Sequence, residues 1–424
     1  MGIEGNPGAF DVVDRQGATV EQAFPRWLIP AVVGFAPVLL LLLTWVPAGD
    51  WSPWQWLVRS RSLAVIGAEL FVIVIAVREG MLAASLDRGW PKAVLAAGAV
   101  LVAVALGTAI FAPNPLEART LTAFWAIHAL FGVAVFHLCA RQLRPADLIR
   151  CYLAGFVLFT ALFALFVLQV PDPARFNWTK ALPAATHIRH LGYYAAAAIG
   201  LAGGLMAAAE RRSAWAAAFA VAALASALAF WTGSRGTIAA VTGGLIASLV
   251  IVPGVRKLRC WAGVIGSTTL GAVLVYWLPS PAANMGFART LEATAGDNLA
   301  TGRTEMWRIV LEAIEKRPLF GYGEGQMHDV ATYSTMIQPH NLLLQTTLAW
   351  GAVGTLCLFV LALAYARRVL PAIRTDEALI APFLAMATLA AFSMFDGALF
   401  HPLPVSIFAA CAGLLACGSR RIAA

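Results

Sequence analysis

Charged residues are scarce in this sequence. Only 12% of the 424 residues are Asp, Glu, Lys or Arg, whereas 60% are hydrophobic and the mean hydropathy is +0.76. Soluble globular domains carry about 25% charged residues, which keep their surfaces solvated. The composition therefore excludes a soluble globular protein and predicts a polytopic membrane protein.

Signatures of two other protein classes are also missing. The six cysteines all lie within or at the ends of apolar segments, so we expect no disulfide framework. The first 26 residues are polar and partly acidic and lack the basic start and short apolar core of a signal peptide. We therefore expect the first apolar helix to be retained.

Metal and nucleotide sites are not indicated either. The seven histidines are scattered, and no metal-ligand pair stands in an expected extracytoplasmic loop. Residues 318–325 are rich in glycine, but no strand pattern precedes them and no Lys-Ser/Thr pair follows, as a phosphate-binding loop would require. We expect a tight turn there, no metal and no cofactor.

Twelve apolar segments have the length and composition of membrane helices. The expected fold class is therefore all-α, a multi-pass bundle of about twelve transmembrane helices with both termini on one side. The segments are 27–46, 63–77, 93–112, 120–139, 151–170, 191–209, 214–231, 237–252, 260–278, 343–366, 378–395 and 403–418.

Basic residues indicate the orientation of these helices. Most Lys and Arg lie before the first segment, after the last, or in every second loop between them, so we place that side, and both termini, in the cytoplasm. The net charge of +8 is thus explained by topology rather than by nucleic acid. Arg59, Arg61 and Arg119 flank segments on the opposite side, where we expect interfacial anchors. The expected parts are a cytoplasmic segment 1–26, helices one to nine in 27–278, an extracytoplasmic loop 279–339, and helices ten to twelve with the C-terminus in 340–424.

The long loop 279–339 has a helical pattern of its own, which is typical of functional loops. Residues 304–316 predict an amphipathic helix, with apolar residues at three- and four-residue spacing. Arg303 stands at its start, where a cation opposes the helix dipole, so another role must maintain it. Within the membrane, Glu69, His128 and His137 are the clear ionisable residues, and for them a functional role and structural pairing within the bundle are both open. In the first case Glu69 would support a site on the extracytoplasmic face.

His340 and Asn341 immediately precede the tenth apolar segment. In a continuous helix, the spacing from His340 to Gly351 equals about three turns, so we expect His340, Gly351 and Gly354 to share one face. Two glycines permit close approach of a neighbouring helix, which would turn this face into the protein. His340 is therefore expected at headgroup level, directed inward, as a candidate catalytic residue.

Several short motifs together resemble the O-antigen ligase and polymerase superfamily, over about residues 185–360. His340-Asn341, followed by nine residues and Gly351-Ala352-Val353-Gly354-Thr355, is similar to the signature of the ligase branch. The other motifs are Trp231-Thr232-Gly233-Ser234-Arg235-Gly236-Thr237, Thr301-Gly302-Arg303 with Trp307, Pro318-Leu319-Phe320-Gly321-Tyr322-Gly323 and, more weakly, Arg189-His190-Leu191-Gly192.

This resemblance implies a metal-independent glycosyltransferase of the GT-C type in the inner membrane of a Gram-negative cell. It would transfer O-antigen from undecaprenyl diphosphate to the lipid A-core oligosaccharide at the periplasmic face, in lipopolysaccharide biosynthesis. The alternatives are an O-antigen polymerase, a protein O-oligosaccharyltransferase and, outside enzymes, a transporter of lipid-linked sugar.

The residues suit this chemistry. Departure of a lipid diphosphate concentrates negative charge, and arginines can bind phosphate oxygens in bidentate fashion. The candidates, in order, are Arg303, Arg189, Arg235 and Arg289.

The acceptor hydroxyl needs a base, for which we select His340; nearby arginines are expected to disfavour its charged form. Asn341, Asp396 and Glu69 are possible supporting residues. For Asp396, in the last extracytoplasmic turn, three interpretations are open: orientation of the acceptor, pairing with an arginine, or a plain turn residue, which is the commonest case.

Overall fold

The chain folds into helices joined by short connections. The computed structural model describes residues 25–47, 51–84, 90–178, 181–278, 281, 302–331 and 337–423, and no β-strand occurs within these ranges. The α-helices are α1 (Leu28–Leu43), α2 (Pro53–Ser60), α3 (Leu63–Arg78), α4 (Met81–Ala84), α5 (Lys92–Ile110), α6 (Pro115–Arg141), α7 (Pro145–Gln169), α8 (Leu191–Ala208), α9 (Arg212–Trp231), α10 (Arg235–Ile251), α11 (Leu258–Tyr276), α13 (Arg303–Lys316), α14 (Met327–Val330), α15 (Leu342–Thr375), α16 (Ile380–Ser393) and α17 (Pro402–Ala423). Short 3₁₀ turns are η1 (Ile188–His190), η2 (Pro253–Arg256), η3 (Glu377–Leu379) and η4 (Ala398–Phe400).

Each of the twelve apolar segments corresponds to one of these helices. Within the described ranges, eight spans are long and apolar enough to cross a membrane alone: α5, α6, α7, η1 with α8, α9, α11, α15 and α17. Helices α2 and α3 are long and apolar enough only as a pair, which is bent by 58°. Helices α1, α10 and η3 with α16 are shorter apolar helices. The all-α polytopic membrane fold is confirmed. The count of twelve spans and the cytoplasmic location of the termini stay predictions.

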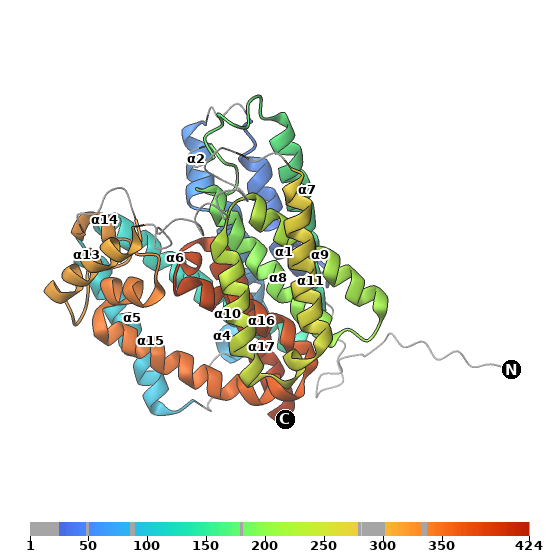
Figure 1. Ribbon diagram of the computed structural model, residues 1–424. Helices are drawn as coiled ribbons and strands as arrows, with labels where there is room; N and C mark the ends of the chain where they lie inside the picture. Colours follow the sequence, from blue (N-terminus) through green and yellow to red (C-terminus); the bar gives the residue numbers. More distant parts are fainter. Residues whose placement is uncertain are drawn as a thin grey trace.

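The helices are arranged as a large bundle with a smaller group beside it (Figure 1). The bundle contains α1, α7 to α11, α16 and α17, whereas α5, α13, α14 and the first part of α15 lie together on one side of it. The second part of α15 extends back toward the bundle and packs on α17. The start of α15 and the end of α16 thus lie where the two groups meet.

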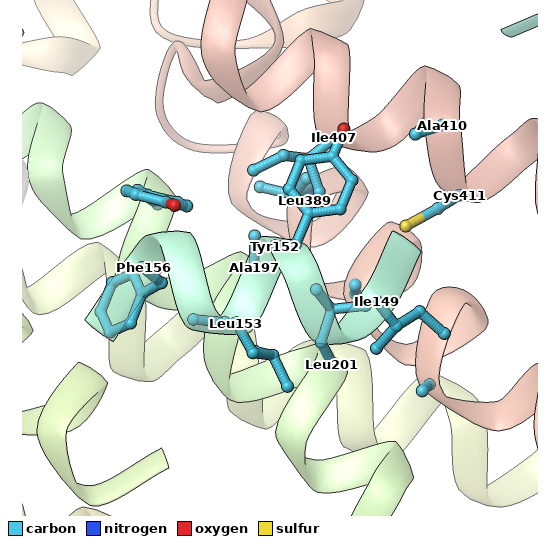
Figure 2. Close-up of a cluster of buried hydrophobic side chains, with 14 of the residues drawn as sticks. Ile149, Tyr152, Leu153, Phe156, Ala197, Leu201, Leu389, Ile407, Ala410 and Cys411 are labelled. Carbon is cyan, nitrogen blue, oxygen red and sulfur yellow. The ribbon is translucent and has the colours of Figure 1, made fainter. Parts of the chain in front are cut away.

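The core of the bundle is built on α7 and α8. Figure 2 shows side chains of α7 packed against residues of α8, α16 and α17. Lipid is as apolar as these side chains, so there is no hydrophobic drive between the helices. Close packing of the side chains stabilises the bundle instead. The labelled residues are Ile149, Tyr152, Leu153, Phe156, Ala197, Leu201, Leu389, Ile407, Ala410 and Cys411.

Small residues bring α8 and α16 into backbone contact. A Cβ on Gly200 would lie 2.6 Å from the Cα of Ala385, and one on Gly204 would lie 2.2 Å from the Cα of Ala381. Such small-xxx-small spacing allows membrane helices to approach closely. This contact holds the first turn of α8 and the end of α16 in fixed relative positions.

Helix α15 is interrupted at Gly351. This residue has φ +64° and ψ −172°, a conformation essentially restricted to glycine. A Cβ there would lie 2.2 Å from the carbonyl carbon of Leu319. Two hydrogen bonds of a regular helix, from the N–H groups of Ala352 and Val353 to the carbonyls four residues earlier, are therefore not formed. Another segment must supply partners for these two N–H groups and two carbonyls.

The glycine-rich segment 318–323 fills the interruption. Its backbone exchanges bonds with α15 in both directions, so all four open groups have partners. The bonds are Ala352 N–H to Pro318 carbonyl (2.8 Å), Val353 N–H to Leu319 carbonyl (3.1 Å), Tyr322 N–H to Leu348 carbonyl (2.9 Å) and Gly323 N–H to Ala349 carbonyl (2.8 Å).

The expected shared face of His340, Gly351 and Gly354 is therefore wrong. His340 lies before the first residue of α15, with φ +52°, and the interruption separates it from Gly354. The two glycines serve local purposes instead. Gly351 permits the interruption, and Gly354 makes room for the side chain of Trp350, which a Cβ would approach to 2.4 Å.

Candidate functional site

Asp396 is the centre of the candidate site, in the turn between α16 and α17. Its Oδ1 accepts hydrogen bonds from Nδ1 of His340 (2.9 Å), the hydroxyl of Tyr193 (2.7 Å) and the backbone N–H of Gly397 (2.7 Å). Its Oδ2 accepts a bond from Nη2 of Arg303 at 3.1 Å. The structure thus brings together His340, Arg303 and Asp396, which are distant in the sequence.

The environment keeps this carboxylate ionised. The Asp396 side chain is 15% exposed, and burial alone would raise its pKa. The hydrogen bond from His340, the charge of Arg303 and the Tyr193 hydroxyl outweigh burial and hold the pKa of Asp396 well below its usual range. The carboxylate is therefore ionised at neutral pH.

The Asp396 contact selects the tautomer of His340. Because the carboxylate can only accept, Nδ1 carries the proton and Nε2 becomes the ring's acceptor. The backbone is also constrained: His340 has φ +52°, and the preceding Pro339 carbonyl accepts a bond from the Trp307 indole at 2.8 Å. We expected arginines to dominate the surroundings of His340; the charge that contacts it directly is negative.

Asn341 connects the start of α15 to the end of α16. Its side-chain oxygen accepts a bond from the Leu344 N–H (3.1 Å) and caps α15, and its Nδ2 donates to the Met394 carbonyl (2.8 Å). Its role is therefore to position His340, the residue that precedes it, against Asp396.

Arg303 begins α13, which covers the stretch with the amphipathic pattern. Pairing with Asp396 explains why a cation stands at a helix N-terminus. Helix α13 shares a small apolar core with the 318–331 segment and α15, so Arg303 and His340 are carried by one packed unit. The buried members of this core are Met306, Val310, Ala313, Tyr322, Met327, Ala331 and Leu348.

The turns that carry Arg189 and Arg235 pack against each other. The hydroxyl of Thr237 donates to the Gly192 carbonyl at 3.0 Å, and a Cβ on Gly192 would lie 2.2 Å from Oγ of Ser234. A Cβ on Gly236, next to Arg235, would lie 2.6 Å from the ring of Phe392 near the end of α16. Both turns therefore adjoin the region of Asp396, whereas Arg289 lies outside the described residues.

Glu69 belongs to a different cluster. Its carboxylate bonds to Nδ1 of His128 at 2.8–2.9 Å, between α3 and α6, and both side chains are buried. An ion pair or hydrogen bond of this kind satisfies two polar groups inside a membrane bundle. The structure therefore assigns to Glu69 a partner within the bundle, and its expected support of the site stays a prediction.

Sequence reasoning missed two aromatic residues, Tyr193 and His401, around Asp396. Tyr193 donates to the carboxylate, and its ring stacks with His190 (centroids 5.3 Å apart) and His401 (5.4 Å). One signal was available for Tyr193, because it lies one helical turn after Arg189 at the start of α8. His401 gave no such signal, since only the fold brings it to His190.

The arrangement can combine proton acceptance with anion binding. An imidazole oriented by an ionised carboxylate is a general base, and arginines beside it can neutralise a phosphate. Among the described residues, no group of three His, Cys, Asp or Glu side chains is placed to hold a metal ion.

Part of the chain is similar to a known protein family. Residues 220–359 match the family described as O-antigen ligase. The matched region runs from α9 to the middle of α15 and contains Arg235, Arg303 and His340, but neither Arg189 nor Asp396. No curated protein matches the chain.

Proposed function

We propose that the protein is an O-antigen ligase. The match of residues 220–359 to the O-antigen ligase family supports membership of the O-antigen ligase and polymerase superfamily. The ligase transfers O-antigen from undecaprenyl diphosphate to the lipid A-core oligosaccharide. The reaction takes place at the periplasmic face of the inner membrane.

The observation that carries this proposal is the cluster of His340, Asp396 and Arg303. Transfer of a glycan from a lipid diphosphate needs a base for the acceptor hydroxyl and positive charge for the leaving group. His340 with Asp396 provides the first, and Arg303 at 3.1 Å from the same carboxylate provides the second within the same site.

The step is a single glycosyl transfer. The acceptor hydroxyl gives its proton to Nε2 of His340 as its oxygen forms a bond to the anomeric carbon of the donor glycan. The bond from that carbon to the diphosphate oxygen breaks, and undecaprenyl diphosphate leaves with the electron pair. Arg303, with Arg189 and Arg235 on the adjoining turns, stabilises the developing charge. Asp396 holds His340 in the reactive tautomer and stabilises the imidazolium that forms.

We place the site at headgroup level, where both substrates carry their polar groups. This placement is supported by the position of His340 and Asp396 at the ends of the apolar helices α15 and α16 rather than at mid-helix. Membrane lipids are therefore the medium in which donor and acceptor meet, with the polyprenyl and lipid A chains in the bilayer.

Analysis of the lipopolysaccharide made by a deletion strain distinguishes the related functions. We expect a deletion strain to lose the O-antigen ladder and to accumulate finished polymer on undecaprenyl diphosphate. Attachment of a single repeat to core would instead indicate a polymerase, and failure of the lipid-linked sugar to reach the periplasm would indicate a transporter. Restoration of the ladder by the wild-type gene, but not by a His340→Ala gene expressed at the same level, completes the test.

A further inference from the structure

The two oxygens of Asp396 differ in the hydrogen bonds that they accept from the described residues. Oδ1 accepts bonds from Nδ1 of His340 (2.9 Å), the Tyr193 hydroxyl (2.7 Å) and the Gly397 N–H (2.7 Å), whereas Oδ2 accepts a bond from Arg303 at 3.1 Å. A carboxylate oxygen has about two lone-pair sites for donors. The donors on Oδ1 therefore compete for the same negative charge, and Tyr193 competes directly with His340.

Packing fixes the Tyr193 ring in place. The residue is buried, with 1% exposure. The rings of His190 and His401 pack against it with centroids 5.3 and 5.4 Å away, and the ring of Phe392 meets it edge-on at 4.8 Å. A ring enclosed in this way cannot turn without displacing its neighbours. The hydroxyl is therefore held on the carboxylate of Asp396.

The hydroxyl of Tyr193 is not required to hold α8 against α16. Backbone contact at Gly200 and Gly204 brings these helices together, and the ring of Tyr193, without its hydroxyl, makes the apolar contact with Phe392. Removing the hydroxyl alone would leave both kinds of contact in place. An effect of its removal on transfer would therefore come from the charge distribution at Asp396 and not from the fold.

We infer that Tyr193 is a positioning residue that adjusts the base: its hydroxyl limits the share of the Asp396 charge that acts on His340. The inference rests on the proposed function, in which His340 must be neutral to accept the proton of the acceptor hydroxyl. Without the Tyr193 hydroxyl, more of the negative charge on Oδ1 would face Nδ1 of His340 and favour the imidazolium. Fewer molecules would then carry a free base at acidic pH, so Tyr193 extends transfer to lower pH.

The elements packed around this pair carry further charged and titratable groups. Arg303 begins α13, Arg235 begins α10, Arg189 and His190 belong to η1, and His401 follows η4. The arginines stay charged at every pH of an assay. Burial lowers the pKa of His401 to about 4, so this ring is neutral above that pH. All of these groups remain when only Tyr193 is changed, so a difference between the two pH profiles reports on its hydroxyl.

The test measures kcat/KM for the acceptor as a function of pH, with purified protein, lipid A-core from a strain without O-antigen and O-antigen on undecaprenyl diphosphate. The rate should rise with pH as the base becomes neutral and then level off. In Tyr193→Phe this rise should move to higher pH by about 0.5–1 unit, while the level at high pH stays within about 3-fold of wild type. Replacing Tyr193 by 3-fluorotyrosine, whose hydroxyl is a stronger donor, should move the rise to lower pH.

Tyr194→Phe is the matched control. It removes the hydroxyl of the next residue, which is also buried and has no hydrogen-bond partner among the described residues, and it should keep the wild-type pH profile. An unmoved profile in Tyr193→Phe, or an equal fall of kcat/KM at every pH, would overturn the inference. If Tyr193→Phe does not fold, the fluorinated protein decides in the same way. Failure of the wild-type protein to transfer at any pH would count against the proposed function itself.

Discussion

Asp396 accepts a hydrogen bond from His340 at 2.9 Å while its second oxygen pairs with Arg303 at 3.1 Å. His340 and Arg303 belong to the unit formed by α13, the 318–331 segment and the start of α15, whereas Asp396 belongs to the turn after α16. The carboxylate therefore joins the two groups of helices, and the site is complete only when they are docked.

Asp396→Asn should lower transfer by about 10²–10⁴-fold, because the amide can present a donor to Nδ1 and so favour the wrong imidazole tautomer. His340→Ala should be at least as severe. The double variant should lose little more than the worse single variant, since the two residues act as a unit. Initial transfer rates with purified proteins of equal thermal stability measure this. Multiplicative losses in the double variant would show that the residues act independently.

Arg303→Lys should retain more activity than Arg303→Gln and still be impaired, because lysine keeps the charge but loses the planar fork. The same order is expected at Arg189 and, more weakly, at Arg235. Binding of undecaprenyl diphosphate to purified variants is the direct measurement. Arginine variants should bind it more weakly, and His340→Ala should bind it almost normally; the reverse pattern would contradict the assignment of base and clamp.

Gly351→Ala should lower thermal stability in detergent and also transfer. The substitution forces a residue with a Cβ into a glycine-only conformation, at about 1–3 kcal/mol, and places the new carbon 2.2 Å from the Leu319 carbonyl carbon. Gly107→Ala in α5 is the matched control, because nothing lies within 4 Å of its added Cβ, and it should be neutral or stabilising. Equal melting temperatures for the two variants would refute the role given to the interruption.

The helices could be predicted from the sequence because membrane spans are dictated by continuous local hydropathy. Each of the twelve apolar segments overlaps a helix, and Arg303 was recognised from its conflict with the helix dipole. These signals are local, as each depends on residues within a few turns.

The interruption of α15 could not be predicted in the same way. Gly351 stands in an apolar run that reads as one helix, and its φ depends on segment 318–323, about thirty residues earlier. For this reason the prediction that His340, Gly351 and Gly354 share one helix face was wrong. Tyr193 and His401 were missed because the packing of α8 against α16 and α17, not a sequence pattern, brings them to Asp396.

Glu324 should make stability depend on pH. This carboxyl is 1% exposed and accepts a bond from Gln345 at 2.6 Å, and burial raises its pKa to about 7 from an ordinary 4.5. The folded state then binds more protons than the unfolded state between about pH 4.5 and 7. Stability should fall as pH rises through that window, by up to about 3 kcal/mol from this group.

Glu324→Gln should remove this contribution. Melting temperatures measured from pH 5 to 8 should vary less in the variant and exceed the wild-type values at pH 8. Glu312→Gln, at an exposed position of α13, is the control and should keep the wild-type pH profile. A variant with an unchanged slope would show that Glu324 does not titrate in this range.

Transfer should continue in excess EDTA and without added nucleotide, because arginines supply the positive charge that the leaving diphosphate needs. Activity is measured with purified protein, chelator and purified lipid substrates. Recovery of activity only after addition of Mg²⁺ or Mn²⁺ would contradict this expectation.

The four backbone bonds between segment 318–323 and α15 also restrict how this protein can vary. They set the register of the two segments, so inserting or deleting one residue within 318–323 or 348–353 would leave buried backbone groups unpaired. The connecting chain makes none of these four bonds, but its part from His340 to Thr347 carries the candidate base and the first residues of α15, so the number of residues between His340 and Gly351 is restricted as well. Related chains should therefore keep the spacing inside each of the two segments and between His340 and Gly351.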